Sequence, residues 1–363
     1  MNERERFLRC MRFEEVDRVP LMEMGVLPET FERWHREGLP EHVGDLLSLG
    51  EHLGLDRSFN VNWLPIDHDI FPPFERLVLE ETKEDQLIRD SAGVTFRQRK
   101  GMATIPHFIR FPVQNESDYE TLLPRLDGKD PARYAPNFEQ QLRGLHERNE
   151  MVGLYFSAFY GFPRSLMGME SLSVAFHDKP DFVRRIIDDR LQFAKDLYAR
   201  IVRTGELDFV IIWEDMAFKT ASLVSPQMVR EFMLPAYKEL VSLFRDGGAK
   251  LIMVDCDGHV NDLLPIFMEA GIDGTHPCEN AASADPYELR AACPRAALMG
   301  GMDKRRIASG QDSIDAEVKR LGPLVAQGGY IPFLDHYVPM DVSYDTYRYY
   351  VERRRAVLDA CCR

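Results

Sequence analysis

Two carboxylates stand two residues apart at the end of an apolar run. Residues 250–254 read Lys-Leu-Ile-Met-Val, and Asp255-Cys-Asp-Gly-His259 follows directly. An apolar run that turns polar just before an amphipathic segment is typical of a buried parallel strand leading into a helix. Because side chains alternate along a strand, we expect Asp255 and Asp257 to point the same way at its carboxyl end, with Cys256 on the other side.

A pair of ionised carboxylates in one small space is unfavourable unless something offsets their repulsion. A metal ion, a cationic group or a shared proton can do so, and each of these implies chemistry. The structural alternative is that Asp257-Gly258 forms a turn and Asp255 caps the next helix, because Asp and Gly favour such places.

Other chemically capable side chains also follow apolar runs. These positions hold carboxylates, imidazoles, a thiol and aromatic rings, namely Glu23, residues 156–160, Glu214, Asp215, His276, Cys278, Glu279, Asp303, Asp335 and His336. Such groups serve as zinc ligands or as general acids and bases. Structural alternatives exist here too: Asp303 as a helix N-cap, Glu279 as part of a loop. His276 and Cys278 could equally be packed core residues.

Strand-like and helical patterns alternate regularly from residue 150 onward. Apolar runs lie at 151–156, 208–213, 250–254, 271–275, 296–300 and 329–334. Helical patterns lie at 180–203, 225–246, 260–270, 285–292, 313–327 and 343–360. Successive strand-helix units predict an α/β fold with a parallel sheet, and one or two units before residue 65 complete a (β/α)8 TIM-type barrel. A doubly wound open sheet is the alternative. In a barrel the strand carboxyl ends share one mouth, where the polar residues would meet.

The N-terminal third has a different pattern. We predict a helix at 2–13, a strand at 17–23 and helical structure over 28–56. Residues from about 59 to 127 form an insertion or lid with short strands at 59–63, 93–99 and 107–112, within a single domain spanning 1–363. The cluster Asp67-His-Asp69 either faces a cleft or belongs to a solvated loop.

Composition excludes some classes of partner. The net charge is -14, from 45 basic and 59 acidic residues, which argues against nucleic acid or an anionic membrane as the main partner. Six cysteines without a short repeated spacing predict free thiols in a reducing compartment. Neither a signal peptide nor a membrane-spanning run is expected, so we predict a cytoplasmic protein.

Several short motifs, in order and spacing, point to one family. They are Asp17-Arg-Val-Pro20, Trp213-Glu-Asp-Met-Ala-Phe-Lys219, Ser225-Pro226 with Phe232 and Pro235, Asp255-Cys-Asp-Gly258, Gly300-Gly-Met-Asp303 and Asp335-His-Tyr-Val-Pro339. With them the chain resembles the uroporphyrinogen decarboxylase superfamily over nearly its whole length. That superfamily also contains cobamide-dependent methyltransferases, and its fold is a (β/α)8 barrel.

The chain departs from both branches of this superfamily. The decarboxylases use an early loop, Met-Arg-Gln-Ala-Gly-Arg-Tyr, whose arginines bind substrate carboxylates, whereas residues 22–29 here contain no arginine. The methyltransferases place a zinc-binding His-x-Cys pair on one strand and another Cys near the last strand end. Here Asp255, Asp257 and, approximately, His336 occupy those positions. The chain is therefore closer to the methyltransferase branch, with carboxylates and imidazole in place of the sulfur-rich zinc site.

The resemblance implies a methyltransferase of a corrinoid (cobalamin) system. It would move a methyl group between a small methylated substrate, such as a methoxylated aromatic undergoing O-demethylation, and a separate corrinoid protein. Catalytic roles are assigned to Glu214, Asp257 and His336. Substrate contacts are assigned to Phe156, Tyr160, Asp215 and Glu279. The candidate zinc ligands are Asp255, Asp257 and His336.

Two other functions remain open. The first is a uroporphyrinogen-decarboxylase-like lyase acting on a non-porphyrin carboxylic acid, with a cationic clamp from residues such as Arg164, Lys219 or Arg305. The second is a non-enzymatic corrinoid or tetrapyrrole carrier. The chain is expected to be a monomer or a homodimer.

Overall fold

Six parallel strands form one sheet at the centre of the protein. The structure is a computed structural model that describes residues 1–57, 63–101 and 105–361. The strands stand in the order β10-β9-β8-β7-β6-β5. Their bounds are β5 Gly153–Ser157, β6 Phe209–Trp213, β7 Leu251–Asp255, β8 Gly274–His276, β9 Ala297–Met299 and β10 Tyr330–Ile331. All six strands that the sequence predicts after residue 150 are present, in the predicted parallel arrangement.

The register of the sheet decides which strand residues share a level. Trp213 of β6 pairs with Asp255 of β7, and Asp255 pairs with His276 of β8. Strands with apolar residues throughout, such as β6 and β7, suit a sheet that is covered on both sides. On the helical side, the Phe156 ring packs edge-on against Tyr198 and Phe244. Alternation along the strands therefore turns Asp255 and its paired neighbours away from the helices.

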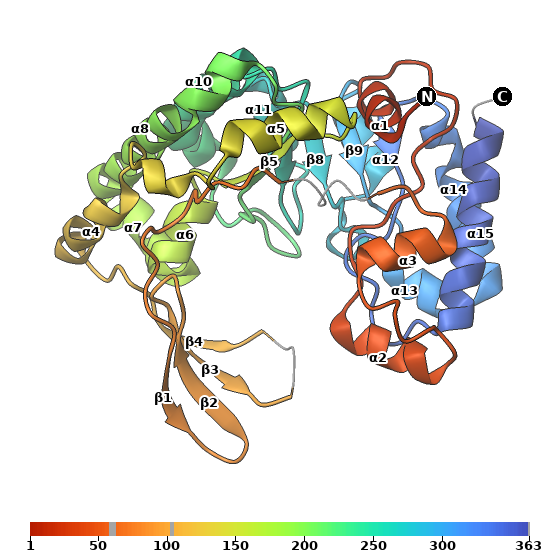
Figure 1. Ribbon diagram of the computed structural model, residues 1–363, viewed down its shortest axis with the longest axis horizontal. Helices are drawn as coiled ribbons and strands as arrows, with labels where there is room; N and C mark the ends of the chain where they lie inside the picture. Colours follow the sequence, from red (N-terminus) through yellow and green to blue (C-terminus); the bar gives the residue numbers. More distant parts are fainter. Residues whose placement is uncertain (58–62, 102–104, 362–363) are drawn as a thin grey trace.

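Helices surround this sheet (Figure 1). The long helices α8 Pro180–Thr204 and α10 Leu234–Asp246 lie at one side, and α14 Gln311–Val325 and α15 Tyr344–Cys361 lie at the other. The shorter ones are α4 Glu116–Leu122, α5 Phe138–Glu147, α6 Gly161–Met167, α7 Met169–Asp178, α9 Pro226–Met228, α11 Leu264–Glu269, α12 Pro286–Ala292 and α13 Lys304–Ala308. A π-helical segment, Val229–Met233, joins α9 to α10 and lies within the single helical stretch predicted at 225–246.

The N-terminal elements depart from the sequence-based prediction in two places. Helix α1 Glu3–Met11 forms as expected, but residues 28–56 give two helices, α2 Pro28–Arg36 and α3 Leu46–Leu53. The first helix ends at Arg36, and a capping box between Asp45 and Ser48 starts the second. Residues 17–23 are not a strand, because the Leu21 backbone pairs with Asp56: its amide donates to the carboxylate at 2.7 Å, and its carbonyl accepts from the Asp56 amide at 2.8 Å.

Closure into an eight-stranded barrel stays a prediction. Beyond the six strands, the described residues contribute isolated parallel bridges, including Trp63 with Gly153 and Val26 with Val338. The first of these lies next to the edge strand β5. The predicted strand at 59–63 lies, except for its last residue, outside the described residues.

A four-stranded antiparallel sheet projects from the body (Figure 1). Its strands are β1 Leu77–Glu81, β2 Asp85–Arg89, β3 Thr95–Arg99 and β4 His107–Arg110, in sequential order. Strands β3 and β4 match the predicted strands at 93–99 and 107–112, whereas β1 and β2 were not predicted. The expectation of an antiparallel segment in the predicted insertion is thus confirmed in its general form.

A buried arginine joins this insertion to the main sheet. Arg190 of α8 donates to the carbonyl groups of Ser157 and His68, each at 2.9 Å. Its guanidinium carbon lies 4.2 Å from the Phe156 ring centroid and 4.0 Å from that of Phe162. The backbone of the Asp67-His-Asp69 cluster therefore serves as an anchor, since Arg133 also donates to the carbonyls of Asp67 and Asp69.

No helix in the described part of the chain has the length and apolar character needed to cross a bilayer. Among the described residues, Cys256, Cys278 and Cys293 are buried and form no disulfide bond.

Replacement of Arg190 tests this anchor. We expect Arg190→Ala to lower the free energy of unfolding by about 3 kcal/mol or more, because two partly buried carbonyl groups lose a charged donor and the rings of Phe156 and Phe162 lose their contact. Urea denaturation followed by circular dichroism measures the change. The matched control is Arg348→Ala on α15. The ion pair of Arg348 with Asp345 is exposed to solvent and contributes below about 0.5 kcal/mol. Equal losses in both variants would contradict the assignment.

Candidate functional site

Asp255 is a buried carboxyl group at the carboxyl end of β7. The Tyr155 hydroxyl donates to its Oδ2 at 2.8 Å, which joins β5 to β7. Burial, helped by the nearby charge of Asp257, raises the pKa of Asp255 to about 7, although the Tyr155 hydrogen bond acts in the opposite direction. Asp255 therefore holds or releases a proton near neutral pH.

Asp257 forms an ion pair with His336 at the carboxyl end of the sheet, which we call the mouth. The His336 Nε2 atom lies 3.7 Å from Asp257 Oδ2, and both side chains are more than a third exposed. Burial alone would raise the pKa of Asp257, but His336 lowers it below its usual value. In return, Asp257 raises the pKa of His336. The two carboxyl groups of the central motif thus differ: Asp257 is paired and ionised, whereas Asp255 takes up and releases its proton near neutral pH.

His276 lies beside this pair in a neutral form. Its Nδ1 atom is 4.0 Å from Asp255 Oδ1, and burial lowers the pKa of His276 to about 4. Tyr337, next to His336, has its pKa raised by burial and then by the charges of Asp255 and Asp257. Neither group carries a charge at neutral pH, so they do not offset the charge of the carboxylates.

A second group of charges surrounds Lys304 at the start of α13. Its ammonium lies 3.5 Å from Glu279 Oε1 and 4.0 Å from Asp335 Oδ1. Glu279 also accepts from the Gly258 amide at 3.1 Å, which links this group to the central motif. Asp335 is fully buried and accepts from the amides of Asn280 and Lys304, each at 3.1 Å. Lys304 is a cation of the mouth that the sequence analysis did not single out.

Asp215 and Arg164 complete the mouth on the side of β6. Arg164 donates to both the carbonyl and the carboxylate of Asp215, at 2.7 Å for the carbonyl. Burial raises the pKa of Asp215 despite this pairing. Arg305, another cation of the proposed clamp, is paired with Asp303, and Asp303 caps α13 as its structural interpretation predicted. These two arginines are committed to protein carboxylates, so the structure does not assemble the cationic clamp of the lyase hypothesis.

Glu214 has a structural position rather than a catalytic one. It is fully buried, and its carboxylate accepts from the amides of Phe159, Tyr160 and Gly161 at 2.7–3.0 Å. The Tyr237 hydroxyl donates to it as well. Because its oxygens are occupied by four donors, Glu214 serves to anchor the first turn of α6, and we do not retain it as a proton donor.

Two predicted substrate contacts also lie outside the cluster. Phe156 is fully buried on the helical side of the sheet, and Tyr160 is fully buried with its ring stacked 6.4 Å from that of Phe176 on α7. The other predicted residues, Asp215 and Glu279, do lie in the mouth. The sequence analysis also missed Tyr155, one position before Phe156. Alternation within β5 separates Tyr155 from Phe156, and the register of the sheet gives Tyr155 the face of Asp255.

The predicted zinc ligands do not converge. Within the described residues, no group of three or more His, Cys, Asp or Glu side chains is arranged to hold a metal ion. Asp255 is bound by Tyr155, whereas Asp257 and His336 pair with each other. A zinc ion requires about four ligands within roughly 2.0–2.3 Å. We therefore derive no step through a metal.

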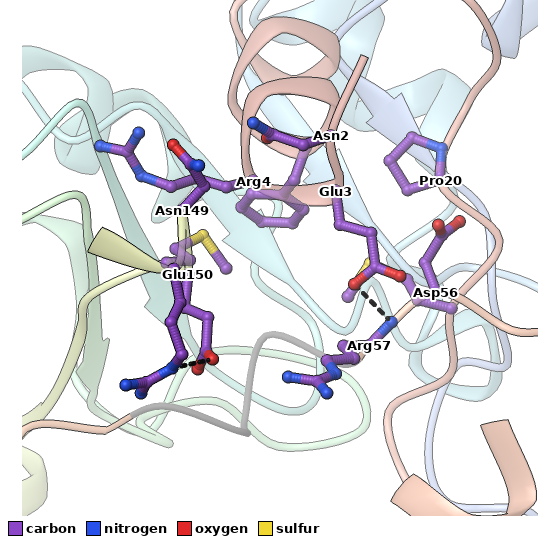
Figure 2. Close-up of a pocket in the computed structure, with 12 residues that line it drawn as sticks. Asn2, Glu3, Arg4, Pro20, Asp56, Arg57, Asn149 and Glu150 are labelled. Atoms are coloured by element: carbon purple, nitrogen blue, oxygen red, sulfur yellow. Dashed lines mark hydrogen bonds and ion pairs between the residues drawn. The ribbon is translucent and has the colours of Figure 1, made fainter. Parts of the chain in front are cut away.

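A cavity of about 460 Å³ lies near the start of β5, at the opposite end of the sheet. Figure 2 shows Asn149 and Glu150 on one side of it and Glu3 and Asp56 on the other. Its lining charges pair locally, as Arg4 does with Asp208 at 2.6 Å. Active sites of parallel α/β folds lie at the carboxyl ends of strands, so we do not assign the chemistry to this cavity.

The hydrogen bond from Tyr155 predicts a measurable effect on Asp255. Because this bond favours the ionised carboxylate, Tyr155→Phe should raise the pKa of Asp255 by about one unit. Carbon-13 NMR of the aspartate carboxyl groups measures the shift. Tyr337→Phe is the control, since Tyr337 makes no hydrogen bond to Asp255 in the described structure. An unchanged or lowered pKa in Tyr155→Phe would show that the bond is not formed.

The structural role of Glu214 predicts a loss of stability. In Glu214→Gln an amide group faces backbone donors, so we expect the free energy of unfolding to fall by about 2–4 kcal/mol. Asp257→Asn, which alters a partly exposed ion pair, should change it by about 1 kcal/mol or less. Thermal and urea unfolding compare the two. A stable Glu214→Gln variant would argue for a chemical role instead.

Comparisons with known proteins identify the family and a similar fold. The family model for uroporphyrinogen decarboxylase (URO-D) matches residues 90–357. A methyltransferase from Methanosarcina mazei has a similar structure, with a TM-score of 0.56 and 16% sequence identity over 98% of each chain. At that identity the likeness concerns the fold. No curated protein matches the chain. The match to the family model covers most of the chain, and on this basis the protein belongs to the uroporphyrinogen decarboxylase family.

Proposed function

We propose that the protein transfers a methyl group between a small methylated substrate and a corrinoid carried by a separate protein. The observation that carries this proposal is the Asp255 carboxyl group, which is held by Tyr155 and lies beside the Asp257–His336 pair at the carboxyl end of the sheet. A methyl ether needs a proton on its oxygen before the carbon is attacked, because an alkoxide or phenoxide is a poor leaving group. Asp255 is the group suited to supply it.

The partner's corrinoid would supply the cobalt nucleophile that takes the methyl group, and the bond between methyl carbon and ether oxygen would break. The oxygen takes the proton of Asp255 and leaves as a hydroxyl group. Asp255 becomes a carboxylate, which the Tyr155 hydroxyl stabilises through the bond that it already makes. Solvent then returns the proton.

Neighbouring groups are less suited to the acid role. His336 lowers the pKa of Asp257, so Asp257 is ionised at neutral pH. His276 has a pKa of about 4 and carries no extra proton to give. Burial raises the pKa of Tyr155, so its hydroxyl remains protonated. The different environments of Asp255 and Asp257 assign the acid to Asp255 and an electrostatic role to Asp257 with His336.

Exposed apolar residues near the mouth support a macromolecular partner. Phe218, which follows β6, and Met340, which follows β10, expose 63% and 56% of their surface. Large apolar side chains in such positions often belong to interaction surfaces. The methyltransferase from Methanosarcina mazei has the same overall fold, and this likeness also motivates the choice of reaction.

A lyase acting on a carboxylic acid is the second candidate. Lys304 favours it, because its nearest carboxylate oxygen is as far as 3.5 Å away and it could bind a substrate carboxylate. The commitment of Arg164 and Arg305 to protein carboxylates disfavours it. The two functions differ in product: one releases a demethylated alcohol or phenol, and the other releases carbon dioxide.

Replacement of Asp255 tests the proposal. With a methoxylated aromatic donor and a reduced corrinoid protein, or reduced cobalamin in its place, Asp255→Asn should transfer methyl groups about 10²–10⁴-fold more slowly. In the wild type the reactive form is protonated, so the rate should hold below pH 7 and fall about tenfold per unit above it. The absorbance change of the corrinoid measures both effects.

The control for this experiment is Asp345→Asn, an exposed carboxylate on α15 that should leave the rate unchanged. Full activity of Asp255→Asn would remove Asp255 from the acid role. Release of carbon dioxide without methyl transfer would favour the lyase.

A further inference from the structure

Glu23 is a buried carboxylate that the proposed chemistry does not use. It is 1% exposed, and its Oε1 atom accepts from the amides of Leu334 at 3.0 Å and Met24 at 3.3 Å. Its Oε2 atom accepts from the Tyr350 hydroxyl and from Arg354 Nη1, each at 3.3 Å. A carboxylate with this many donors and no contact with solvent is fixed in one orientation.

Helix α15 supplies both side-chain partners of Glu23. Tyr350 and Arg354 lie one turn apart on it, and Arg354 Nη1 donates to the Tyr350 hydroxyl at 2.6 Å. The same Nη1 donates to the Pro332 carbonyl at 3.2 Å. The ion pair is fully buried, with side chains exposed by 1% or less. The C-terminal helix thus holds Glu23 against the chain that leaves β10.

That chain leads directly to the candidate site. Leu334, which donates to Glu23, is followed by Asp335, His336 and Tyr337. The Asp335 amide donates to the Met302 carbonyl at 2.9 Å. After Tyr337, the Val338 amide donates to the Gly25 carbonyl at 2.9 Å. The loop with His336 and Tyr337 is therefore attached at both ends to residues 23–25.

The contact at Gly25 restricts the loop further. A Cβ atom at this position would lie 2.7 Å from Cε1 of the Tyr337 ring, which is closer than such atoms approach one another. Only glycine lets the Tyr337 ring rest on this backbone, beside the carboxylates of the mouth.

From these contacts we propose that Glu23 is a positioning residue for the loop that carries His336 and Tyr337. Arg354 and Tyr350 fix Glu23, Glu23 fixes Leu334, and Gly25 receives Tyr337. Through this chain of contacts the C-terminal helix places His336 opposite Asp257. Glu23 touches no reacting group, so its effect on the site passes through the loop.

A pair of double variants isolates the decisive hydrogen bond. In Glu23→Leu with Arg354→Met, apolar residues replace the buried ion pair, a change that proteins often tolerate, but the Leu334 amide loses its acceptor. In Glu23→Gln with Arg354→Met, the charges are also gone, but the glutamine oxygen can still accept from Leu334. The difference between these two proteins reports on the bond and not on the charges.

Amide hydrogen exchange is the measurement, and it needs no substrate. We expect exchange at residues 334–338 to become about tenfold faster or more in the leucine variant and to stay within about threefold of wild type in the glutamine variant. Exchange in β6 and β7 should not change in either. Equal behaviour of the two variants, or acceleration throughout the core, would overturn the proposal.

Gly25→Ala tests the other end of the loop with the Glu23 network intact. The added methyl group should displace Tyr337 and speed exchange at Val338 by about tenfold, while exchange at Leu334 stays as in wild type. Leu358→Ala, which removes a buried side chain elsewhere on α15, should lower stability without a selective effect on this loop. Selective loosening of the loop in Leu358→Ala would show that the helix acts in a general way, without Glu23.

Discussion

The repulsion between Asp255 and Asp257 is the constraint on which the candidate site depends. Asp255 ends β7 and Asp257 follows it by two residues, and the charge of Asp257 contributes to the raised pKa of Asp255. The two carboxyl groups have different partners, which reduces their repulsion. Asp257 gains an imidazole partner, His336, and ionises, whereas Asp255 is buried against a hydroxyl and has a pKa of about 7. One motif thereby holds two carboxyl groups with different pKa values.

This arrangement requires that separate segments meet with precision. Tyr155 comes from β5 and Asp255 from β7, and the register of the parallel sheet sets their distance. His336 comes from the loop after β10, whose position depends on contacts with the N-terminal segment and with α15. Glu214 similarly fixes the start of α6, because its carboxylate accepts hydrogen bonds from three backbone amides there. Glu23 and Glu214 thus bind backbone amides of segments next to the candidate site.

The charge distribution distinguishes this site from one that binds a polyanionic substrate. Arginines near the mouth are paired with carboxylates of the protein itself, as Arg164 is with Asp215. Lys304 lies between Glu279 and Asp335 and does not give the mouth a positive excess. A site of this kind suits a substrate whose reacting oxygen needs a proton more than it suits one that carries many carboxylates.

The sequence by itself determined the parallel strands after residue 150 and most of their helices, and it indicated Asp255 and Asp257 as candidate residues. These features follow from local periodicity, because a buried strand and an amphipathic helix each leave a pattern within about ten residues. Local pattern also suggested the family. It could not show that Phe156 faces the helices and Tyr155 the mouth, because a shift of one residue exchanges the two faces of a strand.

Only the tertiary structure decided the partners of the buried carboxylates. From the sequence Glu214 is expected at the carboxyl end of the sheet, but its three backbone donors lie 53–55 residues earlier in the chain. Glu23 meets Leu334 across 311 positions, and Tyr155 meets Asp255 across 100. Burial and pairing set the pKa of a carboxyl group, and both arise from contacts between distant segments. Composition and spacing therefore identified the groups capable of chemistry, while the packing of the chain determined which of them are placed to perform it.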